Sequence, residues 1–249
     1  MQVLKTKGLV LREVEVGESD KIITVFTEEK GKISISAKGA RKPRSRFIAG
    51  TQVFAYCDFI CYKGKNIWNL SQVEVIETFH SLRNDIYTLS YGIYAMELLE
   101  TIGVENSPSK QLLQLSLHTL WQLAKGDLDP TLVIRIYEWK SMSLSGFTPA
   151  VTQCVGCGKE EHFIYFSIGE GGVLCKECSH LDPAADKISN GTLYTIHYIL
   201  ASDLKSLFQF QVSDSVLKEL SKLSKKFLHY YLDKTFKTMS FIEELKTLY

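Results

Sequence analysis

The spacing of apolar residues changes once along the chain, near position 80. Before that point, apolar and polar residues alternate in runs rich in Val, Ile, Thr and aromatic residues, and this period of two predicts β-strands. The runs cover residues 3–15, 21–27, 32–38, 52–62 and 66–79. Five short strands in so compact a stretch predict a small barrel, for which an OB-fold is the natural candidate.

Beyond position 80 the apolar residues recur at helical spacing. Helices are expected over residues 85–102, 108–125, 130–146, 190–200 and 215–234. Ser107 before Pro108 and Asp129 before Pro130 each supply an N-cap residue followed by a first-turn proline. The sequence therefore predicts an α+β, multidomain chain: an N-terminal five-stranded OB-fold-like barrel over residues 1–80, followed by a helical domain over residues 81–249.

Two Cys-x-x-Cys pairs interrupt the helical half, Cys154 with Cys157 and Cys175 with Cys178. Seventeen residues separate the pairs, which is the spacing of a four-thiolate zinc site. The residues between them predict a hairpin with one strand over residues 163–168 and a glycine-rich turn. We expect an inserted module at about residues 150–182 that holds one zinc ion.

The expected cell compartment and the number of thiols both indicate what the cysteines do. The N-terminal residues carry early lysines and no long apolar run, and no stretch approaches the roughly 18 to 20 apolar residues of a membrane span. We therefore expect a cytoplasmic protein, whose compartment keeps thiols reduced and favours metal over disulfides. Four thiolates close the coordination shell, so the zinc is expected to be structural. Two disulfides, or His162 or His180 in place of one cysteine, are the alternatives.

Charge is balanced overall, with 29 Lys and Arg against 28 Asp and Glu, but it is unevenly distributed. Residues 31–57 contain no acidic residue, while Lys and Arg crowd the stretch KISISAKGARKPRSRF at residues 32–47. A cationic groove beside aromatic rings suits single-stranded nucleic acid, because phosphates attract cations and bases stack on rings. The candidate binding residues are Lys32, Lys38, Arg41, Lys42, Arg44 and Arg46, with possible stacking partners Phe47, Phe54, Tyr56, Tyr62 and Trp68. A solvated, mobile loop is the alternative.

Catalytic motifs are missing from the sequence. It contains no HExxH pair, no G-x-S-x-G elbow and no GxxxxGK[ST] phosphate loop. No catalytic residue and no small-molecule substrate is therefore proposed, and an enzyme is not expected. Cys57 and Cys61, four positions apart on a predicted strand, are expected to be buried thiols. The lysine-rich face of the helix over residues 215–234 is expected to face solvent.

Four segments resemble the RecO family, the bacterial recombination-mediator and DNA-repair proteins. They are residues 7–45, residues 97–123, residues 134–158 and the second cysteine pair. The most specific pieces are GESDKIITVFT at residues 17–27, the loop AKGARKPRS at residues 37–45, and the R-x-Y-E helix that leads into the first cysteine pair. The resemblance spans nearly the whole chain in the family's order. It places Lys38, Arg41, Lys42, Arg44 and Ser45 in the family's basic-loop motif, and the four cysteines in its zinc positions.

The resemblance implies a function as well as a fold. It implies binding to single- and double-stranded DNA, annealing of complementary strands, and partnership with RecR and with the C-terminal tail of the single-stranded-DNA-binding protein. The complex would help load the recombinase onto coated single strands. Arg135 and Lys140, and the lysine face near the C-terminus, are candidate contacts for such an acidic tail. The alternative is a zinc-containing protein-interaction scaffold with only weak DNA affinity.

Overall fold

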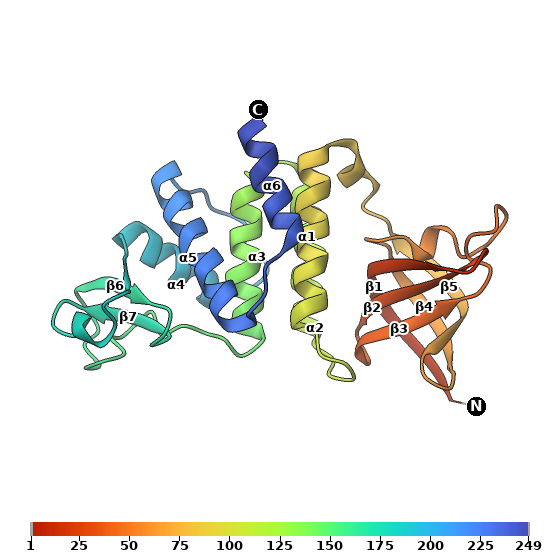
Figure 1. The fold of residues 1–249 in the computed structure, drawn as a ribbon, viewed down its shortest axis with the longest axis horizontal. Coiled ribbons are helices and arrows are strands. Elements are labelled where there is room, and N and C mark those ends of the chain that lie inside the picture. Colours follow the sequence, from red (N-terminus) through yellow and green to blue (C-terminus); the bar gives the residue numbers. More distant parts are fainter. Residues whose placement is uncertain (1, 249) are drawn as a thin grey trace. The chain divides into compact units, whose positions relative to one another are not determined.

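The structure is a computed structural model that describes residues 2–248 (Figure 1). The chain forms two compact units. One combines the residues up to Lys125 with those from Phe236 onward, and the other is Gly126–Thr235. The division of the chain into domains at position 80 stays a prediction.

Five strands of the first unit form a closed barrel. They are β1 (Val3–Val16), β2 (Asp20–Thr27), β3 (Gly31–Ala37), β4 (Tyr56–Lys63) and β5 (Trp68–Glu77), in the order β1-β2-β3-β5-β4. β1 pairs antiparallel with both β2 and β4, and a parallel pairing of β3 with β5 completes the circuit. This confirms the predicted five-stranded, OB-fold-like barrel.

The barrel core follows from the alternation in the sequence. On β3 the buried positions Ile33, Ile35 and Ala37 alternate with half-buried Lys and Ser residues, so one face of the strand points inward. Cys57 and Cys61 on β4 point the same way and are fully buried, as predicted. Burial raises the pKa of both thiols to about 12, which leaves them neutral and inert.

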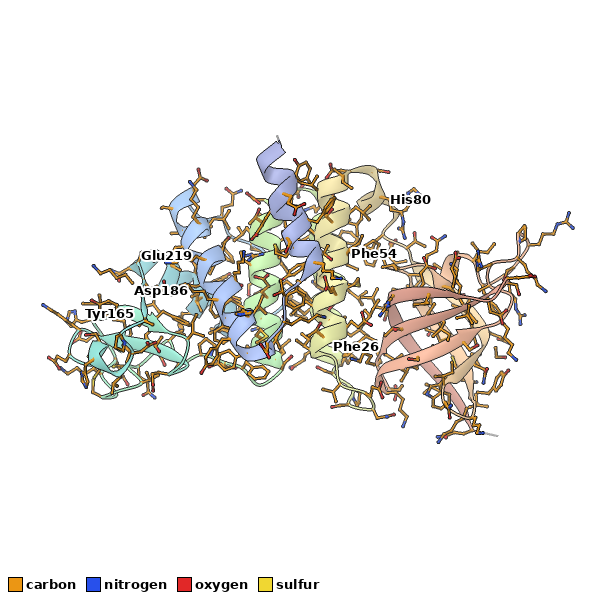
Figure 2. All side chains as sticks on the ribbon, in the orientation of Figure 1. Phe26, Phe54, His80, Tyr165, Asp186 and Glu219 are labelled. Carbon is orange, nitrogen blue, oxygen red and sulfur yellow. The ribbon has the colours of Figure 1, made fainter. Side chains whose placement is uncertain are left out.

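Helices complete the first unit: α1 (Ile86–Ile102), α2 (Lys110–Lys125) and α6 (Lys237–Leu248), with short 3-10 turns η1 (Ala49–Thr51) and η2 (His80–Asn84). Asp85 caps α1 by accepting the Thr88 N–H at 2.8 Å. Phe26 and Phe54 point from the barrel toward α1 (Figure 2), where their buried rings meet the backbone at Gly103 and Gly92. No helix was predicted where α6 lies.

The second unit packs α3 (Pro130–Leu144), α4 (Asn190–Ala201) and α5 (Asp214–Leu232) with a small sheet. The sheet has the order β7-β6-β8, from β6 (Phe163–Ser167), β7 (Gly172–Cys175) and β8 (Asp186–Lys187), and η3 (Ser179–Leu181) follows β7. Trp139 of α3 is buried with its ring centroid 5.8 Å from that of Phe166 and 4.9 Å from that of Phe227. The predicted helical region with an inserted hairpin is confirmed.

Across residues 2–248, none of the helices has both the length and the apolar character needed to cross a bilayer.

Candidate metal centre and nucleic-acid interface

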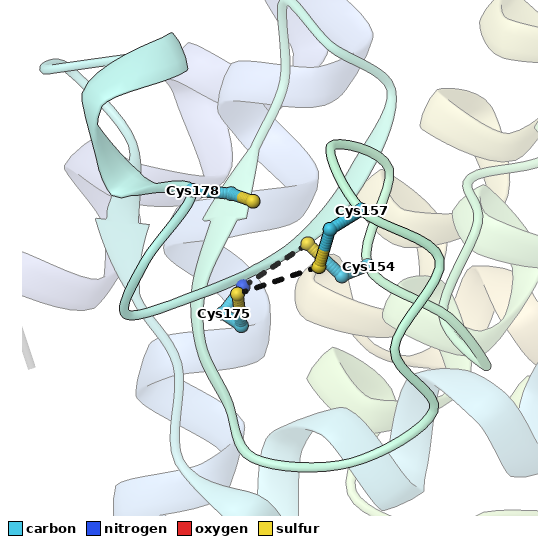
Figure 3. A group of neighbouring side chains, drawn as sticks. All are labelled: Cys154, Cys157, Cys175 and Cys178. Atoms are coloured by element: carbon cyan, nitrogen blue, oxygen red, sulfur yellow. Dashed lines mark hydrogen bonds between the residues drawn. The ribbon is translucent and has the colours of Figure 1, made fainter.

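The four predicted cysteines meet at one point (Figure 3). Their Sγ atoms all lie within 4.8 Å of one another, and the Sγ atoms of Cys157 and Cys175 are 3.8 Å apart. A tetrahedral zinc site with Zn–S bonds of about 2.3 Å places its sulfurs about 3.8 Å apart. The cluster therefore fits a zinc module. All six cysteines of the chain are free, so the disulfide alternative is not what the structure shows.

Neither candidate histidine joins this cluster. The Nδ1 atom of His180 lies 2.8 Å from the Glu177 carbonyl oxygen, and His162 is an exposed residue in a left-handed turn with φ +57°. The ligand set is therefore the four thiols alone.

Glycine shapes the first cysteine pair into a tight turn. A Cβ on Gly156 would lie 2.9 Å from the Sγ of Cys178, so no larger residue fits between the two pairs. Gly158 adopts φ +75° and donates its N–H to the Cys154 carbonyl at 2.8 Å. The N–H of Cys154 in turn donates to the Lys159 carbonyl at 2.7 Å. These bonds aim the thiols of the first pair at the second.

The thiols differ in their electrostatic surroundings. Burial acts to raise the pKa of Cys154, but N–H groups of Cys175, Cys157 and Gly156 outweigh it and lower the pKa to about 6. The Cys175 N–H lies 3.3 Å from the Cys154 sulfur. Burial and the neighbouring thiols raise the pKa of Cys178 to about 12. Backbone N–H groups thus stabilise the Cys154 thiolate, and a divalent cation at the cluster would stabilise all four thiolates.

The hairpin that carries the second cysteine pair is fixed to its own unit. Ala150 donates its N–H to the Gly171 carbonyl and accepts the N–H of Val173, both at 2.9 Å. Tyr231 of α5 donates its hydroxyl to the Ile168 carbonyl at 3.1 Å. Because the ligand set leaves no open position and the hairpin is anchored on both sides, the site is suited to holding structure rather than to catalysis.

The basic loop (residues 38–46) joins β3 to η1. Its predicted cations Lys38, Arg41, Lys42, Arg44 and Arg46 are all exposed. Ala40 and Phe47 are buried in the barrel core, so the loop is pinned at two points. Turn hydrogen bonds link Lys42 N–H to the Gly39 carbonyl at 3.2 Å and Ser45 N–H to the Lys42 carbonyl at 2.9 Å. The loop therefore has a defined conformation.

Two of the loop's arginines are engaged with the barrel. Arg41 lies 2.9 Å from the Glu15 carboxylate and donates to the Gly17 carbonyl at 3.1 Å. Its backbone N–H donates to the Ser19 carbonyl at 2.9 Å. Arg46 donates to the Ser71 carbonyl at 2.9 Å. These arginines hold the loop against the β1–β2 turn and β5.

Although residues 31–57 contain no acidic residue, acidic residues from elsewhere in the chain approach the basic loop in three dimensions. Asp20 accepts the Gly39 N–H at 2.7 Å, and this bond, with the Ser19 hydroxyl and then Lys38 and Lys42, holds the pKa of Asp20 below its ordinary value. Glu18, Ser19 and Asp20 belong to the GESDK motif, whose role in positioning the loop was not predicted.

Three cations remain available to a ligand. Within residues 2–248, the side chains of Lys38, Lys42 and Arg44 form no hydrogen bond and no ion pair, although both lysines act on Asp20 through space. Their exposed heads are the part of the predicted site that the structure leaves free to bind.

Lys32 lies apart from the basic loop. Its Nζ donates to the Glu100 carbonyl at 2.7 Å, in the last turn of α1, where a cation is favourable to the helix dipole. This contact gives Lys32 a structural role, and its part in DNA binding stays a prediction.

The aromatic residues predicted to stack on bases differ in their exposure. Phe47 and Phe54 are 8% and 1% exposed, so neither ring can stack on a base. The prediction that they are stacking partners is wrong for both. Tyr56, Tyr62 and Trp68 are half-buried on β4 and β5.

The candidate tail contacts on α3 are engaged inside the second unit. Arg135 is 4% exposed, with a guanidinium nitrogen 3.1 Å from the Glu138 carboxylate. Lys140 donates to the carbonyls of Leu200 and Ser202, both at 2.7 Å. Burial lowers its pKa. Both cations therefore stabilise the unit. Because Arg135 is buried and paired, the expectation that it faces a peptide ligand is wrong, whereas a tail contact by half-buried Lys140 stays a prediction.

The lysines of α5 face solvent as predicted. Lys222 and Lys226 nevertheless each lie 2.7 Å from the Asp186 carboxylate of β8.

Comparison with known proteins decides the family. Residues 1–79 match the family described as Recombination protein O N terminal, and residues 83–240 match Recombination protein O C terminal. The chain belongs to the RecO family. DNA repair protein RecO of Acetivibrio thermocellus is 41% identical over 246 residues, which cover 98% of both chains. DNA repair protein RecO of Thermoanaerobacter sp. is 33% identical over 248 residues, which cover 100% of both chains.

Proposed function

We propose that this RecO-family protein is a non-enzymatic DNA-binding and strand-annealing protein that mediates recombination in DNA repair. The observation that carries the proposal is the ordered basic loop, which presents the unpaired cations Lys38, Lys42 and Arg44 on an OB-fold-like barrel. Barrels of this kind bind oligonucleotides, and relatives over the full chain bear the name DNA repair protein RecO.

The loop acts by neutralising phosphates. Lys38, Lys42 and Arg44 bind the DNA backbone, and Arg41 and Arg46 hold the loop in place while adding charge at its edge. Two complementary strands bound in this way repel one another less and meet at a higher local concentration. Annealing then requires no covalent step.

The metal in this proposal is zinc, one ion per chain, held by Cys154, Cys157, Cys175 and Cys178. When bound, it supplies the positive charge that four clustered thiolates need. Its role is to fix the β6–β7 hairpin in the second unit.

Membership of the RecO family supports the proposed binding partners of this protein. They are single- and double-stranded DNA, RecR, and the C-terminal tail of the single-stranded-DNA-binding protein, with recombinase loading onto coated strands as the outcome. The place of action is the cytoplasm, at the nucleoid.

Strand annealing by the full-length protein tests the function. The variant carries Lys38→Glu, Lys42→Glu and Arg44→Glu, and a matched control carries Lys110→Glu, Lys187→Glu and Lys205→Glu, exposed lysines outside the basic loop, the cysteine cluster and α5. The loop variant is expected to anneal complementary oligonucleotides at least tenfold more slowly, both bare and coated with single-stranded-DNA-binding protein. The control, with the same change in net charge, should keep most of the wild-type rate.

Equal annealing by a folded loop variant would remove the loop from the mechanism. A gel shift of the wild-type protein at near-physiological salt distinguishes direct DNA binding from the alternative, a protein-interaction scaffold with only weak DNA affinity. Tight binding without a partner supports direct DNA binding, and no shift supports the scaffold.

A further inference from the structure

A groove in the first unit lies between α2 and the strand ends of the barrel. It has a volume of about 660 Å³ and continues past Trp121 into a second hollow of about 430 Å³. Its apolar walls come from Ile76 on β5, Phe79 after it, and Leu117 and Trp121 on α2. We refer to it as the α2 groove.

Large apolar side chains in this groove face solvent. Trp121 is 59% exposed and Ile76 is 47% exposed. An exposed tryptophan at the wall of a concave, largely apolar site is the arrangement that protein interfaces use for their most important contacts. These two side chains bury little apolar area when the first unit folds, so a ligand that covers them would gain the free energy of burying them.

Five polar side chains that line the α2 groove form no hydrogen bond with the described residues. Among residues 2–248, no hydrogen bond or ion pair is formed by the side chains of Glu28, Tyr56, Gln114, His118 or Gln122. Glu28 is half-buried, and its carboxylate forms no ion pair with the described residues. Half-buried, unpaired carboxylates favour a cationic ligand.

The charge of the groove restricts what can bind there. Glu28 and Glu77 line it, and Lys125 is the only Lys or Arg among the described lining residues, at the end of the second hollow. Glu77 keeps one oxygen on the N–H groups of Thr78 and Phe79, at 2.7 and 2.9 Å, and its other oxygen is open. Two carboxylates repel a phosphate backbone and attract Lys or Arg.

We propose that the α2 groove is a docking site for a partner protein, and that it takes a short segment in which a large apolar side chain stands next to Lys or Arg. The apolar side chain packs against Trp121 and Ile76, and the cation pairs with Glu28 and Glu77. This surface is opposite in charge to the basic loop, so a protein partner and DNA occupy different parts of the unit.

Two synthetic peptides probe this site on the full-length protein. Both carry a fluorescent label and the core Leu-Phe-Leu, flanked by arginine in one and by glutamate in the other, and binding is followed by fluorescence anisotropy. The arginine peptide is expected to bind saturably and at least tenfold more tightly than the glutamate peptide. Trp121→Ala should weaken its binding tenfold or more, as for other interface hot spots. Glu28→Gln should weaken it at least threefold.

Two substitutions serve as controls. Tyr194→Ala removes another exposed aromatic ring, and Glu74→Gln removes an exposed carboxylate of β5 that does not line the groove. Both should bind the arginine peptide as the wild type does, and all variants should keep the wild-type affinity for DNA.

Several results would overturn the proposal. They are no saturable binding, equal binding of the two peptides, or unchanged binding by a folded Trp121→Ala variant. Displacement of the peptide by single-stranded DNA would assign the groove to nucleic acid. Self-association that sedimentation detects in the wild type but not in Trp121→Ala would assign it to a second copy of this chain.

Discussion

At the scale of single residues, a few glycines set where backbones meet. Gly31 opens β3 with φ +60°, and the carbonyls of Val104 and Ser107, between α1 and α2, pack directly against it. Lys32 follows and donates its N–H to the Val104 carbonyl at 3.3 Å. This contact within the first unit leaves no room for a side chain.

Replacing Gly31 with Ala should therefore be costly. The new Cβ would lie 2.3 Å from the Ser107 carbonyl oxygen and 2.7 Å from that of Val104. Displacing backbone adds to the strain of a positive φ, so we expect a loss of about 3 kcal/mol in the free energy of unfolding, measured in urea. Gly17→Ala is the control, because Gly17 has φ +58° but nothing within 4 Å of the new Cβ. It should lose only about 1 kcal/mol, and equal losses would contradict the packing argument.

Burial on a strand could be predicted from the sequence, but the partners of charged side chains could not. The burial of Cys57 and Cys61 followed from strand alternation, which is local. Arg41, Arg135 and Lys140 looked like free cations because the groups that engage them come from distant parts of the chain or become buried with them. A cation's partners depend on tertiary structure, which periodicity does not describe.

At the scale of elements, β8 and α5 are joined by one carboxylate between two lysines. Asp186 has a side chain only 10% exposed, and Lys222 and Lys226 each reach it at 2.7 Å. Burial acts to raise its pKa, but the two lysines outweigh burial and hold the pKa below its ordinary value. The carboxylate form is thus favoured by folding.

The stability from Asp186 should depend on pH in a defined direction. Its lowered folded-state pKa makes the contribution complete above pH about 4 and lost as the pH falls through the folded-state value. At pH 7 we expect Asp186→Asn to lower the free energy of unfolding by about 1 kcal/mol, discounted because both lysines are largely exposed. The difference from wild type should shrink below pH 4. Asp58→Asn, at an exposed position of β4, is the control, and a difference that stays constant with pH would contradict the assignment.

We expect the β6–β7 hairpin to depend on a metal ion held by the four cysteines. Cys175→Ser with Cys178→Ser should abolish metal content, measured as one zinc ion per wild-type chain by mass spectrometry. Structural zinc contributes on the order of 10 kcal/mol, so the second unit should lose its fold and the protein its solubility. Cys57→Ala with Cys61→Ala, which removes two thiols outside the cluster, should keep the ion. A metal-free, well-folded double-serine variant that still lost DNA binding would contradict a purely structural role.

Most elements were predicted to within a few residues because their periodicity is strong. The strand expected over residues 21–27 is observed as Asp20–Thr27, and the last predicted helix, over residues 215–234, as Asp214–Leu232. β8 is two residues long, too short for any period to show. The β3–β5 pairing that closes the barrel could not be predicted from the sequence either, because it joins Ile35 and Trp68 across many intervening residues.

At the scale of the whole molecule, a nearly neutral chain carries separate regions of opposite charge. The 29 cationic and 28 anionic side chains cancel in the sum. In the first unit, however, the basic loop presents three unpaired cations while the α2 groove presents two carboxylates. Overall charge therefore gave no indication of a partner, whereas its distribution supports DNA at one surface and a basic protein segment at the other.

The salt dependence of DNA affinity tests the central claim most directly. Affinity of the full-length protein for a single-stranded oligonucleotide is measured between 50 and 200 mM salt, values in the range where counterion release is strong. Lys38→Ala with Lys42→Ala and Arg44→Ala should bind more weakly, with a slope of log affinity against log salt that is shallower by about 2, roughly 0.7 for each lost contact. A folded triple variant with the affinity and slope of the wild type would contradict DNA binding by the basic loop.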